Sequence, residues 1–335
     1  MSHASARLTA ATLTPEALSL ALGRLFGADS VLHAVSGGLD SMVLWHLLHR
    51  SGHPHTVAHV NYHLRGADSD YDESLVRRVA ADRGVRLDVL SNSTLIGAAD
   101  VQARARAIRF DYFAQVVQAQ GHAATLLAHH RDDQLESLIV GLTRGGGPRA
   151  LAGMRTLHQG RYRPLLDVPK SALRAYAKTH HVRYRDDRSN NADCYLRNRV
   201  RHHVLPALTS LEARTSEASA RGMRQQRQLL DFAEGQAWQL AHACADPAVP
   251  HALSTVRLRE LDGLGFALHT WLRAHRFASG VVDDIADRVH SAAPARARFD
   301  NRARTHSVYV TGMRLWLART GESEVSLPIA PERPS

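Results

Sequence analysis

The chain contains very little cysteine. Cys194 and Cys244 are the only two in 335 residues, and neither belongs to a C-x-x-C pair. Zinc and iron–sulfur sites held by cysteines use closely spaced pairs, and a disulfide framework uses several cysteines. The sequence therefore excludes a cysteine-ligated metal site within the chain and a disulfide scaffold, and we expect a cytoplasmic protein.

Long apolar runs and lysines are also scarce. No stretch approaches the roughly 20 apolar residues of a membrane helix, and residues 1–15 lack the basic start and apolar core of a signal peptide, so we expect neither. Of 42 basic residues, only Lys170 and Lys178 are lysines, and the net charge is +10. This charge favours a polyanionic partner such as nucleic acid, although an arginine-rich composition can also come from a GC-rich genome.

What is present is an alternation of strand and helix. Apolar runs at 31–35, 56–60, 86–90 and 124–128 each precede a helical pattern, at 40–49, 71–83, 101–118 and 132–142. This alternation predicts an α/β fold with a doubly wound, Rossmann-like parallel sheet. Such sheets bind ligands beyond the carboxyl ends of their strands. We therefore expect the polar segments Ser36–Ser41, Asn61–Arg65 and His129–Glu136 to converge at one edge.

A smaller, mostly helical region is predicted to follow. It contains a long helix at 216–244, further helices at 261–275 and 281–290, and a hairpin whose strands flank Thr311-Gly312. We predict four segments: an N-terminal extension at 1–27, a catalytic nucleotide-binding domain at 28–212, the C-terminal domain at 213–325 and a tail at 326–335. A helix is also expected at 170–178.

The strongest motif is a glycine-containing loop between the first strand and the first helix. Its residues are Ser36, Gly37, Gly38, Leu39, Asp40 and Ser41. Glycines let the backbone approach a phosphate, and the helix start offers free N–H groups. Asp40 would repel a phosphate unless it holds a magnesium ion. The string is neither a Walker loop nor a dinucleotide fingerprint, and the alternative is a glycine turn with Asp40 and Ser41 as helix caps.

The second motif is acidic and follows the fourth strand. If a helix begins near His129, then His129, Asp132, Asp133 and Glu136 share one face. Three carboxylates on one face repel one another unless a metal or a protonated amine joins them. An attacking lysine amine must lose a proton, which a carboxylate or imidazole can accept. The alternative is a solvated acidic helix start, which the helix dipole favours.

The third signal is arginine. Arg104, Arg106 and Arg109 lie along one expected helix beside Phe110, and a second group lies at Arg197, Arg199 and Arg201. Arginine forks suit the phosphates of ATP or RNA. The alternative is an ordinary solvated surface.

These motifs carry a family resemblance. The Ser-Gly-Gly-x-Asp-Ser string resembles the pyrophosphate loop of the ATP pyrophosphatase superfamily. Ordered blocks at 58–66, 105–110, 128–147, 151–154, 163–167, 187–190 and 197–201 resemble tRNA(Ile)-lysidine synthetases, and the similarity spans Val31 to Leu208. Ser137 stands where that family usually has threonine, and the Gly145–Ala150 segment is altered. The region after Leu208 is only faintly similar.

The resemblance implies a reaction. ATP is expected at residues 36–41 with His59, and Mg²⁺ at Asp40. The C2 oxygen of the wobble cytidine, in the CAU anticodon of tRNA(Ile), attacks the α-phosphate and pyrophosphate leaves. The ε-amine of L-lysine then attacks C2, and AMP leaves. The resemblance also implies that residues 213–325 bind tRNA and that the protein can form a homodimer.

The resemblance and the residue chemistry together suggest a role for each site residue. Asp40, Arg109, His129, Asp133 and Glu136 are expected to be catalytic. Lysine is expected at Asp132, Asp133 and Glu136, and tRNA or phosphate at Arg106, Arg197 and Arg201.

Three other functions agree less well with the sequence. A tRNA thiolase uses the same adenylation but usually carries paired cysteines, which this chain lacks. A ligase like GMP synthetase would need a glutaminase segment, and none is visible. A non-enzymatic RNA-binding protein on an inactivated nucleotide fold would show erosion of residues 36–41 or 129–136, and both motifs are complete.

Overall fold

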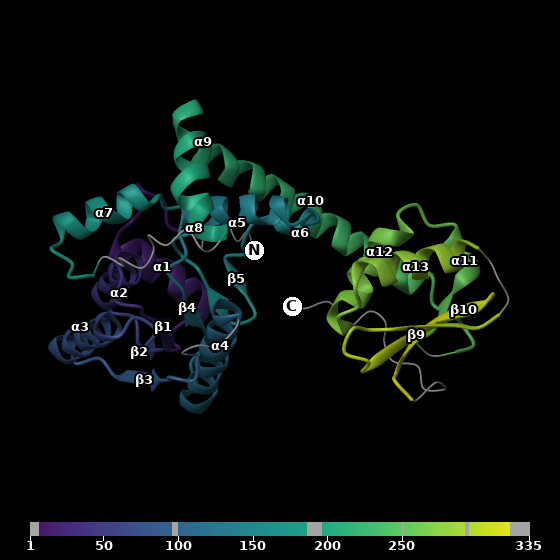
Figure 1. Cartoon of the computed structure of the whole chain (residues 1–335), viewed down its shortest axis with the longest axis horizontal. Coiled ribbons are helices and arrows are strands. Elements are labelled where there is room, and N and C mark those ends of the chain that lie inside the picture. Colours follow the sequence, from purple (N-terminus) through teal and green to yellow (C-terminus); the bar gives the residue numbers. More distant parts are fainter. Residues whose placement is uncertain (1–6, 96–99, 186–195, 250, 292–294, 322–335) are drawn as a thin grey trace. The chain divides into compact units, whose positions relative to one another are not determined.

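The structure is a computed structural model that describes residues 7–95, 100–185, 196–249, 251–291 and 295–321. The chain forms two compact units, Met1–Arg227 and Gln228–Ser335 (Figure 1). Helix α10 (Thr215–Ala243) begins in the first unit and ends in the second. The division therefore falls further along the chain than the predicted boundary at 212/213. Among the described residues, no helix combines the length and apolar character needed to cross a membrane.

The first unit is built on a six-stranded sheet of order β3-β2-β1-β4-β6-β5. Strands β1 (Val31–Ala34), β2 (His55–Asn61), β3 (Leu87–Ser91), β4 (Thr125–Leu126) and β6 (Arg161–Tyr162) are parallel to one another. Strand β5 (Leu157–His158) joins the edge antiparallel to β6. The predicted α/β fold with a doubly wound parallel sheet is confirmed, and the short β5–β6 hairpin is an addition that was not predicted.

Helices cover both faces of this sheet. The helices packed against it are α1 (Pro15–Phe26), α2 (Leu39–Arg50), α3 (Ala67–Arg83), α4 (Val101–Gln120) and α7 (Lys170–Thr179). Helix α5 (Arg131–Thr143) and the short α6 (Pro148–Leu151), which contact each other, follow β4 in the chain. Successive residues of β1 point to opposite faces. Val31 packs in the core that includes α1, α2 and α7, whereas Leu32 packs against α4. Strands buried on both faces explain why their sequences are continuous apolar runs.

Helix α1 lies in the segment that was predicted to be an N-terminal extension. Thr14 caps it by accepting a hydrogen bond from the Ala17 amide, and Pro15 occupies its first turn. Leu18 and Leu22 are fully buried in the core of the first unit. The described part of this segment is therefore packed into the sheet domain.

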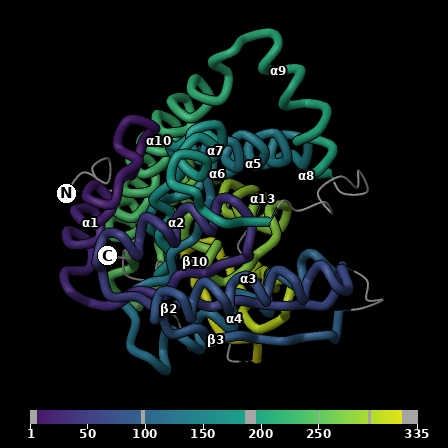
Figure 2. The backbone as a smooth tube through the Cα atoms, turned by 90° about the vertical axis from the view of Figure 1, so that its left-hand side faces the viewer, coloured from purple at the N-terminus to yellow at the C-terminus, as the bar shows by residue number. Residues whose placement is uncertain are grey.

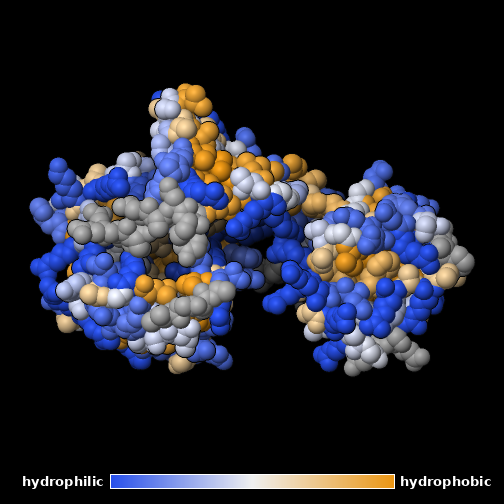
Figure 3. Space-filling view, viewed as in Figure 1, coloured by the Kyte–Doolittle hydropathy of each residue, from blue (hydrophilic) through white to orange (hydrophobic). Residues whose placement is uncertain are grey.

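A helical stretch in three parts follows residue 195. Helix α8 (Leu196–Arg199) continues into a π-helical turn, η3 (Val200–Val204), and then into α9 (Leu205–Leu211). Figure 2 shows α8 beside α5, to which it is packed. Hydrophobic side chains are exposed over α9 in Figure 3, and Leu211 is 84% exposed.

The second unit has its own core and its own sheet. Helices α11 (Thr255–Arg259), α12 (Leu264–Leu272) and α13 (Ser279–His290) accompany a four-stranded sheet of order β7-β10-β9-β8. Its strands are β7 (Leu253–Ser254), β8 (Ala297–Asp300), β9 (His306–Val310) and β10 (Arg314–Arg319). Trp271 is fully buried and donates a hydrogen bond to the Ala237 carbonyl at 2.8 Å. The predicted hairpin is the β9–β10 pair.

Candidate active site

A cavity of about 560 Å³ lies at the carboxyl ends of β1, β2 and β4 in the first unit. Its wall includes the loop after β1, Tyr62 after β2 and His129 after β4. Helices α4 and α7 contribute Arg109 and Lys170, and the π-turn contributes Arg201. Segments after three strands thus meet at one edge, as the strand order requires.

The loop after β1 is shaped to receive an anion. Gly37 has a φ of 88°, and a Cβ there would lie 3.4 Å from the Cβ of Asp72. The Ser36 amide donates to Ser41 Oγ at 3.2 Å, and Ser41 Oγ donates to the Gly38 carbonyl at 2.9 Å. Gly38 is the N-cap of α2, and no described side chain caps this helix. Its first amides are therefore left for a ligand, and the alternative with Asp40 and Ser41 as caps does not hold.

His59 contacts the backbone that leads into this loop. Its ring is buried, and Nδ1 lies 2.8 Å from the Val35 carbonyl, to which it donates. Burial lowers the pKa of His59, so its imidazole is neutral. His59 was expected to contact ATP, but it is not among the residues that line the cavity. The structure gives it contact with the backbone that leads into the loop.

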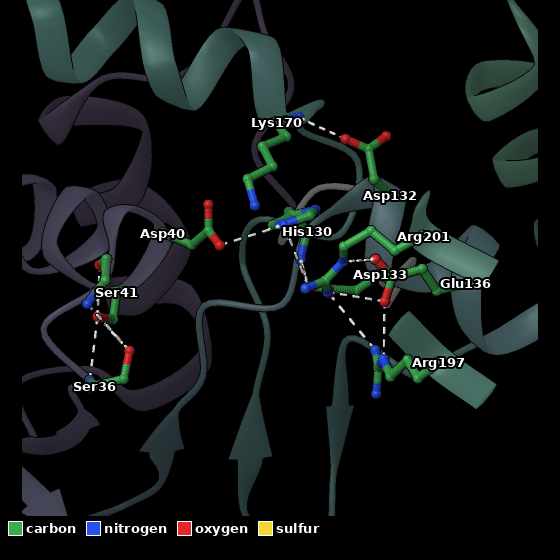
Figure 4. A network of polar contacts seen from close by, with 11 residues as sticks. Ser36, Asp40, Ser41, His130, Asp132, Asp133, Glu136, Lys170, Arg197 and Arg201 are labelled. Carbon is green, nitrogen blue, oxygen red and sulfur yellow. Dashed lines mark hydrogen bonds and ion pairs between the residues drawn. The ribbon is translucent and has the colours of Figure 1, made fainter. Parts of the chain in front are cut away.

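Asp40 and Asp133 face one imidazole. His130 is 2% exposed, and its Nε2 lies 3.4 Å from Asp40 Oδ2 and 3.6 Å from Asp133 Oδ2 (Figure 4). Burial lowers the pKa of His130, but Asp133 and Asp40 raise it by more, and the net change is upward. The other oxygen of Asp40, Oδ1, is buried with no hydrogen-bond partner among the described residues.

The acidic helix begins later than predicted. Helix α5 starts at Arg131 with His130 as its N-cap, and the His130 amide donates to Asp133 Oδ2 at 3.0 Å. His129 precedes the helix, so the prediction that it shares a helix face with the three acids is wrong. It lies at the cavity wall instead, with its Nδ1 buried and without a described partner.

The three acids have different partners. Asp132 accepts hydrogen bonds from the Lys170 amide at 3.0 Å and from Ser216 Oγ at 2.8 Å. Glu136 is 1% exposed and is held by Arg197 and Arg201, with N–O distances of 2.6 to 3.0 Å (Figure 4). A metal or a protonated amine was predicted to join the three carboxylates; in this structure two arginines of the same chain face Asp133 and Glu136, and Asp132 accepts from neutral donors.

More than half of the chain matches one known protein family. Residues 10–208 match the PP-loop domain. The chain belongs to the PP-loop domain family. Its phosphate loop, residues 36–41, lies inside the matched segment, together with His130, Asp133, Glu136 and Arg201.

Relatives with curated names cover the same part of the chain. A tRNA(Ile)-lysidine synthase of Exiguobacterium sibiricum is 40% identical over 195 residues, which is 57% of this chain and 46% of the relative. A tRNA(Ile)-lysidine synthase of Chlorobaculum tepidum is 38% identical over 193 residues, 54% of this chain and 57% of the relative. The chain thus spans about half the length of the curated relatives it matches.

A solved structure agrees on the fold. The U34-tRNA thiolase NcsA from Methanococcus maripaludis, with its [4Fe-4S] cluster, aligns with a TM-score of 0.51 and 17% sequence identity. The alignment covers 63% of this chain and 77% of the thiolase. At this identity the likeness concerns the fold alone.

Arginines also line the cavity that contains residues 36–41, the PP-loop cavity. Arg109 lines it, and its buried Nε has no hydrogen-bond partner among the described residues. Phe110 carries two further guanidiniums, Arg106 at 4.7 Å and Arg161 at 4.9 Å from the ring centroid. Burial and the neighbouring Arg109 and Arg197 lower the pKa of Arg106, which reflects an excess of positive charge. Arg104 is not among the lining residues.

His129 is neutral in this environment. Burial lowers its pKa to about 4, with Asp133 opposing the change and Arg163 adding to it. The pKa of Asp133 is also lowered: burial acts upward, but the facing His130 and the hydrogen bond from its amide act downward by more. Two groups that can accept a proton at neutral pH therefore lie side by side.

Some PP-loop cavity residues were not singled out from the sequence. Lys170, at the first position of α7, lines the cavity, and Figure 4 shows its side chain pointing toward Asp40. The one feature of the sequence that sets Lys170 apart is that it is one of only two lysines in the chain. Arg174 and Tyr62 also line the cavity. The block at 187–190 and Cys194 lie outside the described residues.

Mg²⁺ can be tested against the residues present. Among the described residues, no group of three histidine, cysteine or carboxylate side chains is arranged to hold a metal by itself. Mg²⁺, however, is often held by one or two carboxylates together with substrate phosphates and water. Asp40 lies in the first turn of α2, at the end of the phosphate loop, and its Oδ1 is buried without a described partner, so it fits that role.

Proposed function

We propose that the protein adenylates the wobble cytidine of a tRNA(Ile) with a CAU anticodon and then joins L-lysine to it, giving lysidine, AMP and pyrophosphate. The observation that carries this proposal is the position of His130 between Asp40 and Asp133. The imidazole of His130 contacts both Asp40, in the phosphate-binding loop, and Asp133, a carboxylate that can bind an amine, so the two groups are separated by a single side chain. An enzyme that first activates an oxygen and then delivers an amine to the adjacent carbon needs this proximity.

The first step uses the loop and the arginine wall. The phosphates of ATP would lie at the start of α2, and Mg²⁺ at Asp40 would offset their charge. The C2 oxygen of cytidine forms a bond to the α-phosphorus, and the bond from that phosphorus to pyrophosphate breaks. Arg109, whose Nε is unpartnered in the described structure, is placed to stabilise the charge that develops on the α-phosphate. Lys170 would contact the departing pyrophosphate.

The second step uses the acidic side. The ε-amine of lysine forms a bond to C2, and the bond from C2 to the adenylated oxygen breaks, so that AMP leaves with that oxygen. The proton from the amine passes to His129 or Asp133, which are both unprotonated at neutral pH. Asp133 and Glu136 would hold the ε-ammonium. Asp132 is engaged by Lys170 and Ser216, which supports a positioning role on α7.

The RNA-binding part of the proposal rests on charge. Arg106, Arg197 and Arg201 are the proposed contacts to phosphate, in a chain with a net charge of +10. The region at 213–325 remains the predicted tRNA-binding domain, and homodimer formation remains a prediction.

The thiolase alternative differs in the cofactor that it needs, since the solved structure of similar fold is a thiolase with a [4Fe-4S] cluster. Such clusters are held by cysteine thiolates, usually four. This chain has two cysteines, and Cys244 belongs to the second unit and is buried. The chain therefore lacks the ligands for a cluster of that kind.

The test is lysine transfer. Purified protein is incubated with ATP, Mg²⁺, labelled lysine and a CAU-anticodon tRNA(Ile) transcript, alongside Asp40→Ala and the exposed control Asp82→Ala. We expect label in the RNA for the wild type and Asp82→Ala, and none for Asp40→Ala or without ATP. An Asp40→Ala variant that released pyrophosphate at the normal rate would contradict the placement of Mg²⁺. Release of pyrophosphate without label in the RNA would refute lysine as the nucleophile.

A further inference from the structure

Glu136, which we propose binds the lysine ammonium, is already paired with two arginines. Glu136 Oε1 accepts from Arg201 Nε at 2.6 Å, and Oε2 accepts from Arg197 Nε at 2.8 Å and Arg201 Nη2 at 3.0 Å. Asp133 Oδ1 is 3.6 Å from Arg197 and 3.7 Å from Arg201. Two guanidiniums thus face two carboxylates, and their charges balance. Among the described side chains, Asp133 and Glu136 both already face a guanidinium, so a lysine ammonium entering between them would be a surplus cation.

We propose that Arg197 and Arg201 mask Glu136 in the free enzyme and exchange it for phosphates of the bound RNA, so that lysine binds after the RNA. This inference rests on the proposed function and adds an order of substrate binding to it. RNA would complete the lysine site by removing the two guanidiniums that occupy it.

The exposure of the three side chains supports an exchange. The side chain of Glu136 is 2% exposed, whereas those of Arg197 and Arg201 are 40% and 27% exposed. An anion can therefore reach the guanidiniums from solvent while the carboxylate stays enclosed. Phosphate accepts the same two-pronged hydrogen bonds from arginine that a carboxylate does. Arg199, which is also exposed, extends the basic surface of this stretch.

The backbone that carries the arginines has an element able to move them. Arg197 lies in α8 and Arg201 in the π-helical turn η3, between two α-helical segments. A π-turn holds one more residue per turn than an α-helix and is frequent at functional sites. If η3 returns to α-helical geometry, the residues on one side rotate about the helix axis relative to those on the other. Such a shift in register is a discrete, two-state change that RNA contacts can bias.

The inference predicts coupling between RNA and lysine. Lysine binding to the wild type is measured by calorimetry with α,β-methylene-ATP, which blocks the chemistry, in the presence and absence of the CAU transcript. We expect the transcript to tighten lysine binding on the order of 5- to 150-fold, the usual range for two coupled ligands. Lysine must tighten RNA binding by the same factor. Equal lysine affinity with and without RNA would overturn the inference.

Substitutions at Arg201 test whether this residue blocks lysine binding at Glu136. Arg201→Met removes the guanidinium together with its charge and should bind lysine more tightly than the wild type when RNA is absent. Arg201→Lys keeps a positive charge beside Glu136 and should show a smaller gain. A merely structural role for Arg201 predicts the opposite, weaker binding. Arg199→Met is the matched control, because Arg199 lies in the same stretch, is exposed and makes no contact with Glu136 among the described contacts. It should leave lysine affinity in the absence of RNA unchanged.

Lysine transfer by the wild type is measured in parallel, so that the two proposals can fail separately. Transfer of label without any coupling would overturn the order of binding and leave the proposed function intact. Absence of both lysine binding and label would refute the proposed function, and the inference with it.

Discussion

Replacing Lys170 with methionine tests which phosphates of ATP lie close to the Lys170 ammonium in the cavity. The ammonium of Lys170 points toward Asp40 beside the phosphate loop, and no described carboxylate forms an ion pair with it (Figure 4). Methionine keeps most of the length of the side chain and removes only the charge. The loss should therefore fall on the phosphates that lie near Asp40, which we place at the β and γ positions.

The magnitude follows from Coulomb's law. A unit charge about 4 Å from a phosphate is worth about 4 kcal/mol at an effective dielectric constant of about 20. Lys170 is only half-buried and its charge is partly screened by solvent, so we reduce this to about 1.4 kcal/mol. That difference corresponds to about a tenfold weaker affinity for ATP.

The assay compares ATP with AMP, which lacks the β- and γ-phosphates. Calorimetric titration should show weaker ATP binding to Lys170→Met and unchanged AMP binding. Lys178→Met is the matched control, since Lys178 is the only other lysine, lies on the same helix α7 and is exposed outside the cavity. The reasoning is refuted if Lys170→Met weakens ATP and AMP equally, or if it behaves like Lys178→Met.

Three further predictions concern the loop, the first helix and pH. Gly37→Ala should lower the free energy of unfolding by about 1–2 kcal/mol because Gly37 has a positive φ, and it should also weaken ATP binding. Gly52→Ala, at a position with a similar φ and open space around it, should lower stability alone. Equal affinity of the two variants for ATP would contradict this prediction. Leu22→Ala should lower the free energy of unfolding in urea by about 2–5 kcal/mol, and Leu20→Ala, which is exposed, by far less; similar losses would place α1 outside the core. Burial lowers the pKa of His33 from 6.5 to about 4, so its contribution to stability is complete above pH 6.5 and is lost as the pH falls toward 4. Urea unfolding at pH 7.5 and 5 should show this loss, and a higher stability at pH 5 would count against it.

The local parts of the fold were predictable from the sequence. Strands β1 and β2 are apolar runs because both faces of the sheet are covered, and the phosphate loop is a contiguous string whose chemistry can be read residue by residue. Strand β4 is only two residues long in the structure, yet its apolar run predicted it. Helix α1 was missed although Thr14 and Pro15 form a typical helix start.

The long-range parts were not predictable. Glu136 and Arg201 are 65 residues apart, and no periodicity in the sequence indicates that they pair. The start of α5 was misplaced because His130, an uncommon N-cap, takes the position that serine or aspartate usually marks. The Asp132 contacts with Lys170 and Ser216 join three helices that lie far apart along the chain. Such partners are fixed by the packing of α5, α7 and α10, which the sequence alone does not give.

The position of the two lysines gives the protein a built-in chemical reporter. Reagents that acylate amines have only two side-chain targets in this chain, one inside the cavity and one outside it on the same helix. A nucleotide bound beside Asp40 should shield the ammonium of Lys170 from acylation and leave that of Lys178 as an internal reference. The ratio of the two modified peptides, read by mass spectrometry, would then report occupancy of the cavity in an unaltered protein, without a probe or a substitution.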